Sequence, residues 1–419
     1  MAERLRIIVC GMVGNHPLGG VAWDYFHYVL GLSELGHDVY YHEDTWCWVN
    51  HPLLGYPTDD PSYSVMLIGG FFRDHAPHLA DRWHYFHLHD RHFGMSAAEF
   101  DEVARSADVF LNVSGASFIP ESLNPRAVKV FMDTDPGYNQ MVMATRPAWS
   151  ENVDRWVAQV RGHDRHLTYA ENIWNDDCLL PRLDIDWRPT RCVVTADPWQ
   201  RAPIPPPVGG AFTTVMSWAY FRGPLVYNGV EYGGKAPEFE RFYDLPRRTR
   251  HPMTVAVAGT YQPAETIKAN GWRTADAKTA SLTPQAYLDF IADSFGEWSI
   301  AKNCFVAPRT GWFSCRTACY LMAGRPAVVQ DTGWGRRLPS GEGLIAFSTM
   351  DEALAGLDAV ASDPLRHARA AREVAREYLA PDRVLPPMIE AIMAPARGPG
   401  QLPPAFAGDR AAPPGRQGA

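Results

Sequence analysis

Three polar residues stand where acid–base chemistry is expected. His16 lies in the loop at residues 14–20, directly after an apolar run, and an imidazole with a pKa near neutrality can accept a proton. Asp133 and Asp135 follow another apolar run, so we expect them just past a buried strand, where site residues usually project. Either carboxylate could orient His16 or act as the base itself. Both could equally cap the turn that follows, because Asp is a common turn residue.

A histidine-rich stretch at residues 83–92 suggests a metal site. His87 and His89 alternate like strand neighbours, while His84 and His87 are one helical turn apart. Zinc needs three or four converging ligands with defined geometry, and this stretch does not define such a set. We therefore expect no metal here. The stretch is interpreted as ordinary packing or, alternatively, as the lining of a substrate pocket.

The elements that must position these residues alternate between strands and helices. Apolar, β-branched runs predict the strands, and apolar residues at helical spacing predict the helices. Such alternation is typical of a doubly wound parallel sheet. In the first half the predicted strands are 6–12, 39–41, 108–113, 128–132 and 192–194, and the predicted helices are 21–35, ended by Gly36, and 97–106.

The second half of the chain repeats this alternation. Thr349 and Glu352 form a capping box at the start of one helix, and Asp363 with Pro364 marks the start of another. The predicted strands are 212–216, 253–258, 298–302 and 326–330, with a helix at 284–294.

These patterns predict an α/β protein with two doubly wound, Rossmann-like domains. The domains are residues 1–197 and 211–394, and a stiff proline-rich linker at 198–210 joins them. Residues 395–419 are rich in Pro and Gly and are expected to be disordered. Ligands of such sheets bind outside the carboxyl ends of the strands. The site is therefore expected in a cleft between the domains.

Composition excludes several classes of function. The 419 residues carry 39 basic and 47 acidic side chains, a net charge of −8, which argues against a nucleic-acid partner. No apolar run approaches the length of a transmembrane segment. The 7 cysteines are scattered without a Cys-x-x-Cys pair, which indicates reduced thiols and a cytoplasmic location.

Residues 312–333 resemble the donor-site helix and the following strand of GT-B glycosyltransferases. In that family a small-residue loop opens a helix that ends in Gly-x-Pro before a buried strand, and Gly324-Arg325-Pro326 matches this ending. Gly341-Glu342-Gly343, followed by an apolar strand and an acidic helix, is similar to the next passage of the same domain. The resemblance covers about residues 298–379. It is closest to the CgeB-like group of bacterial glycosyltransferases, which is similar to families 1 and 4.

The resemblance implies two Rossmann-like domains facing a central cleft and a nucleotide diphosphate-sugar donor. The pyrophosphate is negatively charged, and a loop entering a helix offers free N–H groups and the positive end of the helix dipole. Lys235, after two glycines, could add charge or simply precede a helix. Each charged candidate could instead be a solvated surface residue. The implied donor-binding residues are Gly311, Trp312, Phe313, Ser314 and Arg316, with Arg309, Lys302 and Glu342 as further candidates.

On the acceptor side, the layout around His16 resembles inverting small-molecule glycosyltransferases, whose base is a loop histidine oriented by an aspartate. Many retaining GT-B enzymes carry two glutamates at the positions that Gly311 and Cys319 occupy here, so inverting chemistry is favoured. Gly19 and Gly20 could allow close approach of a ligand or only a tight turn. The further acceptor-side candidates are Glu171 and Asn172.

The function predicted from these observations is transfer of a sugar, of the hexosyltransferase type, to a small-molecule or glycan acceptor. No cofactor and no bound metal are expected. Two alternatives stay open: a nucleotide-sugar epimerase of the same fold, and a catalytically silent protein that binds a nucleotide sugar or a partner.

Overall fold

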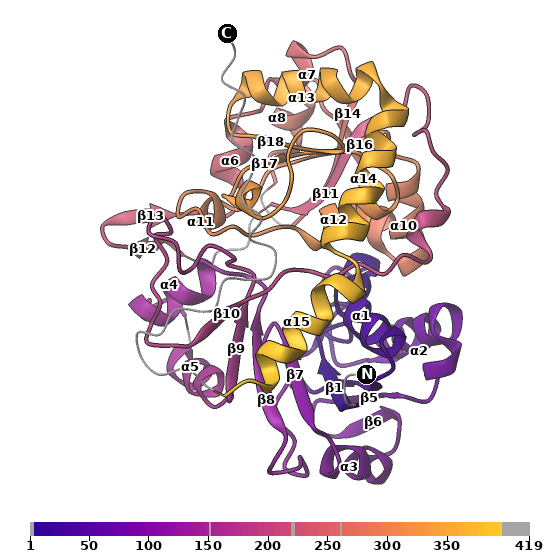
Figure 1. Ribbon diagram of the computed structural model, residues 1–419, viewed down its shortest axis with the longest axis vertical. Coiled ribbons are helices and arrows are strands. Elements are labelled where there is room, and N and C mark those ends of the chain that lie inside the picture. Colours follow the sequence, from indigo (N-terminus) through magenta and orange to yellow (C-terminus); the bar gives the residue numbers. More distant parts are fainter. Residues whose placement is uncertain (1–3, 151, 219–222, 260–261, 396–419) are drawn as a thin grey trace.

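The computed structural model describes residues 4–150, 152–218, 223–259 and 262–395. It forms two α/β units, one above the other along the long axis of the molecule (Figure 1). Each unit contains a parallel or largely parallel sheet covered by helices, as the alternating pattern predicts.

The N-terminal unit contains an eight-stranded sheet in the order β10-β9-β8-β7-β1-β2-β5-β6. Strand β6 pairs antiparallel with β5, and the other neighbours pair in parallel. The order reverses between β1 and β7, which is where such sheets bind ligands. The strands are β1 (Arg6–Cys10), β2 (Asp38–Glu43), β5 (Trp83–His87), β6 (Arg91–Gly94), β7 (Val109–Val113), β8 (Val128–Asp133), β9 (Arg165–Thr168) and β10 (Trp187–Pro189); the helices are α1 (Gly19–Glu34), α2 (Ser62–His75), α3 (Ala97–Arg105), α4 (Tyr138–Thr145) and α5 (Val153–Arg161), and β3 (Val49–Asn50) pairs with β4 (Pro57–Thr58) outside the sheet.

The C-terminal unit contains a six-stranded parallel sheet in the order β15-β14-β11-β16-β17-β18, the doubly wound order of dinucleotide-binding proteins. Its switch point lies between β11 and β16. The strands are β11 (Phe212–Ser217), β14 (Met253–Ala258), β15 (Arg273–Ala275), β16 (Gly296–Ser299), β17 (Ala327–Gln330) and β18 (Leu344–Phe347), with the hairpin β12 (Leu225–Tyr227) and β13 (Val230–Tyr232); the helices are α6 (Ala236–Glu240), α7 (Leu245–Arg248), α8 (Ala264–Ala269), α9 (Ala277–Ser281), α10 (Pro284–Ala292), α11 (Asn303–Val306), α12 (Cys315–Met322), α13 (Met350–Ser362), α14 (Pro364–Tyr378) and α15 (Pro381–Met393).

Helix α15 follows the C-terminal unit in the chain but lies against the N-terminal one, beside β8 and β9 (Figure 1). Leu385 of this helix is buried, and its side chain packs against Gly31 of α1. Arg165 of β9 donates to the carbonyl of Ile392 at 3.1 Å, and Arg188 of β10 donates to that of Pro395 at 2.7 Å. The end of the described chain therefore ties the two units together.

Several local predictions are confirmed. Strand β14 has the predicted bounds, Thr349 and Glu352 form the capping box of α13, and Asp363 caps α14. Gly36 follows α1 with a left-handed φ of 89°. The predicted disorder of the tail concerns residues that lie outside the described part of the chain, apart from Pro395.

Two strand predictions are wrong. Cys192 to Val194 are buried but lie outside the sheet, and the Val194 amide donates to the Leu379 carbonyl at 2.9 Å. Their apolar pattern therefore reflects burial in the hydrophobic core, and the strand of this region is β10. The strand predicted at 298–302 is β16 at Gly296–Ser299, so residues 300–302 form the loop that leaves the sheet.

Two glycines allow backbones from the two units to approach each other closely. A Cβ atom on Gly19 would lie 2.0 Å from the Thr283 carbonyl oxygen, and one on Gly137 would lie 2.2 Å from the Cys304 carbonyl oxygen. Such contacts leave no room for a methyl group. Gly19 therefore serves the contact between the units.

Replacing Gly19 by alanine is expected to destabilise the protein by about 1–3 kcal/mol, the usual cost of overpacking. Alanine normally favours a helix over glycine, so the loss would report the clash with Thr283. Thermal unfolding measures it as a lower Tm. The matched control is Gly335→Ala, where a Cβ would meet nothing within 4 Å. Equal Tm values for the two variants would contradict the proposed contact.

Candidate active site

A cavity of about 470 Å³ lies between the two units, at the carboxyl ends of both sheets. The loops after β1, β7 and β8 and helix α1 form its lower wall. The end of β11, the loop before α6, the loop after β16 and the start of α12 form its upper wall. Its lining includes Gly20, Asp24, His27, Ser114, Thr134, Asp135, Tyr138, Ser217, Trp218, Lys235, Lys302, Phe305, Trp312, Ser314, Cys315, Arg316 and Cys319.

Three cationic side chains converge on this cavity. The Lys302 ammonium contacts both carboxylate oxygens of Asp135 at 2.6 Å, an ion pair across the two units. Arg316 donates through Nε to the buried Glu297 carboxylate at 2.7 Å. Lys235 has no hydrogen-bond or ion-pair partner among the described residues. Its pKa is lowered well below the usual value by burial and by the nearby charges of Arg316 and Lys302.

The N-terminus of α12 faces the same cavity. Ser314 is its N-cap; no side chain in the described part of the chain caps this end, and the first turn carries no acidic residue. Its positive dipole end is therefore available to an anion. The loop before it is firmly held, because Trp312 donates through Nε1 to the Thr134 carbonyl at 3.1 Å and through its amide to Thr310 Oγ1 at 3.1 Å.

Asp24 of α1 is a carboxylate of the lower wall that the sequence analysis missed. Burial raises its pKa to about 6, and a hydrogen bond from the Cys315 thiol offsets part of the shift. The nearby His27 is neutral, because burial lowers its pKa to about 3. Its Nδ1 accepts from the Thr195 amide at 3.2 Å, so Nε2 carries the hydrogen and faces Cys319. The sequence could have pointed to this residue, because Asp24 is the first acidic residue in the otherwise apolar helix pattern that follows Gly19.

The structure brings together seven of the residues predicted from the sequence. They come from the α1 start, the loop after β8, the loop before α6, the loop after β16 and the α12 loop. Asp133 lies just beneath, fully buried, and accepts hydrogen bonds from Asn139, Gln140 and Thr168. Burial raises its pKa to about 6. The seven that line the cavity are Gly20, Asp135, Lys235, Lys302, Trp312, Ser314 and Arg316.

Other predicted residues do not line the cavity in the described part of the chain. His16 lies in the loop after β1, and burial lowers its pKa. Arg309 pairs with Asp177 at 2.9 Å, and the Glu342 carboxylate pairs with Arg366 in an exposed position.

Glu171 and Asn172 sit between the units but make structural contacts. Buried Glu171 pairs with Arg191, and the Asn172 side chain donates to the Gly333 carbonyl at 3.0 Å. A Cβ on Gly311 would lie 2.8 Å from Asn172, so this glycine also serves the contact. Phe313 is buried against Trp334.

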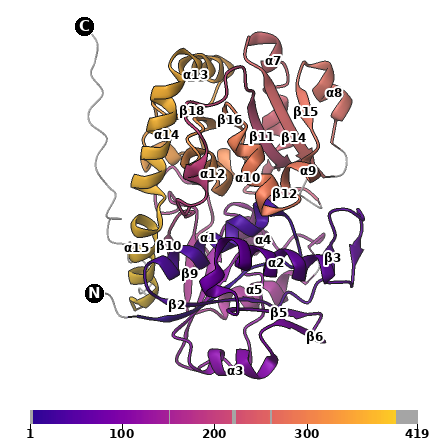
Figure 2. The same ribbon diagram turned by 90° about the vertical axis from the view of Figure 1, so that its right-hand side faces the viewer.

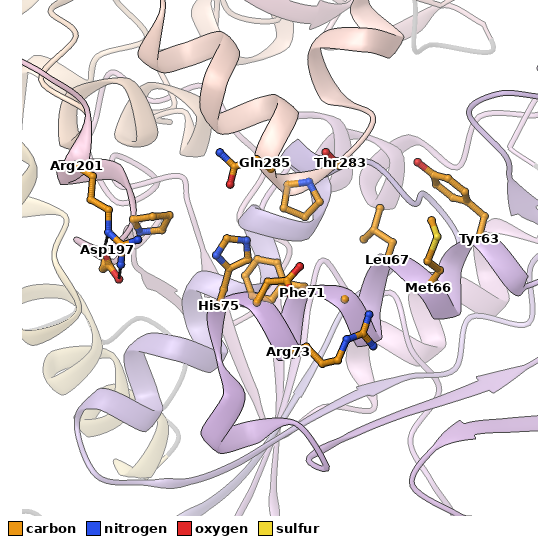
Figure 3. A pocket seen from close by; sticks show the side chains of 14 residues that line it. Tyr63, Met66, Leu67, Phe71, Arg73, His75, Asp197, Arg201, Thr283 and Gln285 are labelled. Atoms are coloured by element: carbon orange, nitrogen blue, oxygen red, sulfur yellow. Dashed lines mark hydrogen bonds and ion pairs between the residues drawn. The ribbon is translucent and has the colours of Figure 1, made fainter.

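A second hollow of about 600 Å³ lies between α2, the linker and the start of α10. Figure 3 shows Leu67, Phe71 and His75 of α2 facing Thr283 and Gln285. None of the predicted site residues lines it. Among the described residues, no group of three or more His, Cys, Asp or Glu could hold a metal ion. No described helix is long and apolar enough to cross a membrane.

No family model and no curated protein matches the chain. Solved structures do match. An α-glucosyltransferase in complex with UDP and a 13-mer DNA containing an HMU base is 10% identical, covers 94% of this chain and 100% of its own, and has a TM-score of 0.56. The Anabaena protein Alr3699/HepE, in complex with UDP and glucose, is 10% identical, covers 93% of this chain and 99% of its own, and has a TM-score of 0.53.

The chain has the GT-B fold. The predicted fold class is therefore confirmed. The narrower grouping with CgeB-like proteins or with families 1 and 4 stays a prediction, as do the domain boundaries. The two sheets of this GT-B chain face each other across the cavity that holds Asp24, Lys235, Lys302 and Arg316.

Because the pKa of Asp24 is raised above its ordinary value of 3.8, its ionisation opposes folding. The free energy of unfolding should be highest below about pH 4, fall between about pH 4 and pH 6, and level off above pH 6. Asp24→Asn removes this loss, so its Tm should exceed that of the wild type increasingly from pH 4 to pH 6 and by a constant amount above, which corresponds to about 3 kcal/mol in the free energy of unfolding.

Unfolding curves across that pH range test this expectation, with the exposed Asp90→Asn as control. A Tm difference that does not change with pH would contradict a raised pKa at Asp24.

Proposed function

We propose that this protein is a glycosyltransferase that moves a sugar from a nucleotide diphosphate-sugar to a hydroxyl acceptor. The observation that carries the proposal is the cluster of Lys235, Lys302 and Arg316 in a half-enclosed cavity at the N-terminus of α12. Asp135 and Glu297 pair with Lys302 and Arg316, whereas Lys235 has no such partner among the described residues. A diphosphate bound beside Lys235 would place an anion next to this amine and favour its charged form.

The solved structures with this fold support a uridine nucleotide. Those named above were determined with UDP, and both align with nearly the whole of this chain. In the proposed complex the diphosphate contacts Lys235, Lys302 and Arg316 and the amides that open α12. Ser217 and Trp218, at the end of β11, lie on the same wall. These cations stabilise the charge that develops on the diphosphate as it leaves.

The lower wall supplies the base. The acceptor oxygen attacks the anomeric carbon, the bond from that carbon to the diphosphate oxygen breaks, and Asp24 takes the hydroxyl proton. A carboxylate with a pKa near 6 is ionised at neutral pH and still basic enough for this task. Asp135 is held by Lys302, and Asp133 is enclosed by hydrogen bonds, so we assign both to positioning. This single displacement inverts the anomeric configuration.

Removing one cation should weaken donor binding. For Lys302→Gln we expect the Kd for UDP to rise about 10- to 100-fold, because a hydrogen bond to a charged group contributes about 1.5–3 kcal/mol. Titration calorimetry measures this, with the exposed Lys278→Gln as the matched control. Lys235→Gln should act in the same direction. Unchanged UDP affinity in both cavity variants would contradict the donor site, and absence of UDP binding by the wild type would contradict the proposed function.

Replacing the base should reduce turnover and leave UDP binding unchanged. Asp24→Asn should lower kcat by at least about 100-fold and leave the Kd for UDP within twofold. Wild-type turnover should fall below about pH 6, as Asp24 becomes protonated. The measurement is a pH series of UDP release from UDP-sugars with a hydroxyl acceptor, and NMR of the product gives the anomeric configuration. If His16→Asn lost a comparable share of kcat while Asp24→Asn stayed active, the general base would be His16 and not Asp24. A retained configuration would exclude the single displacement.

A further inference from the structure

A column of stacked rings runs through the N-terminal unit from its core to its surface. It begins at His42, whose ring lies 5.2 Å from that of His84 at an interplanar angle of 7°. His84 stacks on Phe86 at 6.4 Å, and Phe86 stacks on His89 at 5.2 Å. His89 stacks on Trp46 at 5.3 Å and 6°. The sequence analysis considered part of this stretch as a metal site, but its rings are stacked instead.

The outer end of the column is exposed to solvent. His42 and His84 are each 2% exposed, whereas Trp46 is 53% exposed. A large aromatic ring at the surface offers a face on which another ring can stack. Trp46 also has a φ of 49°, a left-handed conformation that is uncommon for a bulky residue. The backbone therefore holds the indole in place at some cost, which points to a role beyond packing.

The surroundings of Trp46 are built to hold it. His89 contacts the Asp44 carboxylate at 2.7 Å, which fixes the ring beneath the indole. The Arg155 guanidinium lies 6.0 Å from the Trp46 ring and 5.9 Å from that of Phe118. An electron-rich or anionic ring placed on Trp46 would also be attracted to this cation.

The exposed end of the column lies on the cavity's side of the sheet. Trp46 follows β2, His89 follows β5 and Phe118 follows β7, so all three stand at the carboxyl ends of parallel strands. The Phe118 amide donates to the Asp44 carbonyl at 2.9 Å, which joins this rim to the loop that begins at Ser114 in the cavity wall. Figure 2 shows β3, which follows Trp46 in the chain, at the side of the N-terminal unit near its border with the C-terminal unit.

We propose that Trp46 is the stacking platform for the acceptor, and that the acceptor is a flat, hydroxylated aromatic molecule that extends from this rim to the cavity. The inference rests on the proposed function and names its acceptor class. A phenolic hydroxyl, with a pKa near 10, loses its proton to a carboxylate far more readily than an alcohol does. A nucleobase would also stack, but the net charge of −8 disfavours a nucleic-acid chain.

The test measures acceptor binding separately from donor binding. The probe is 4-methylumbelliferone, a fluorescent hydroxycoumarin, titrated into the full-length protein saturated with UDP. Trp46→Ala should weaken probe binding about tenfold or more, as loss of one aromatic stacking contact does elsewhere. Trp46→Phe should restore most of the affinity. Leu365→Ala, which truncates an exposed apolar side chain on α14, should leave probe binding unchanged.

Each outcome decides the question. Equal probe affinity in the wild type and Trp46→Ala would overturn the proposal, as would failure of the probe to bind. Trp46-dependent binding of a maltooligosaccharide or an oligothymidylate, with no binding of the probe, would overturn the aromatic class. The Kd of UDP for Trp46→Ala should equal that of the wild type. A wild type that binds no UDP would contradict the proposed function, and this result is distinct from a loss of probe binding alone.

Discussion

Three basic side chains gather where the two sheets face each other, and the function that we propose depends on how each of them is paired. Lys302 reaches across the units to Asp135, and Arg316 is held by the buried Glu297 of β16. Burial lowers the pKa of Lys235 well below its usual value, and the nearby charges of Arg316 and Lys302 lower it further. Such a cluster is costly without an anion. An anion that binds here would relieve the repulsion and hold the two units together.

The backbone around this cluster is arranged to bring the units close. Gly19 and Gly137 allow carbonyl groups of the opposite unit within a distance that a side chain would forbid. Asn172 bridges to the Gly333 carbonyl, and α15 returns from the C-terminal unit to lie on α1. These contacts fix the distance between the Asp24 wall and the α12 wall. A donor on one wall and an acceptor on the other would therefore meet without large rearrangement.

The sequence predicts the fold well because its signals are local. The apolar runs, the capping box at Thr349 and the Asp363-Pro364 start all depend on residues a few positions apart. The strand wrongly predicted at 192–194 shows the limit of local signals, since burial in the core outside the sheet produces the same apolar pattern as a strand. The site is harder to predict than the fold, because it depends on pairs of residues that lie far apart in the sequence. Asp135 and Lys302 were each suggested by a strand end, but nothing local predicts that they pair.

The carboxylates of the site show why residue type and position alone do not assign roles. Asp24 and Asp133 both have a pKa of about 6, and burial is the main cause in each. Asp133 accepts three side-chain hydrogen bonds and a backbone one, so its oxygens are occupied and it fixes the loop that leads to α4. Asp135, two residues later, neutralises a lysine from the other unit. Asp24 lines the cavity with a thiol as its hydrogen-bond partner, which leaves it the most available carboxylate to take a proton. The same side chain therefore serves as loop anchor, ion-pair partner or base according to what surrounds it.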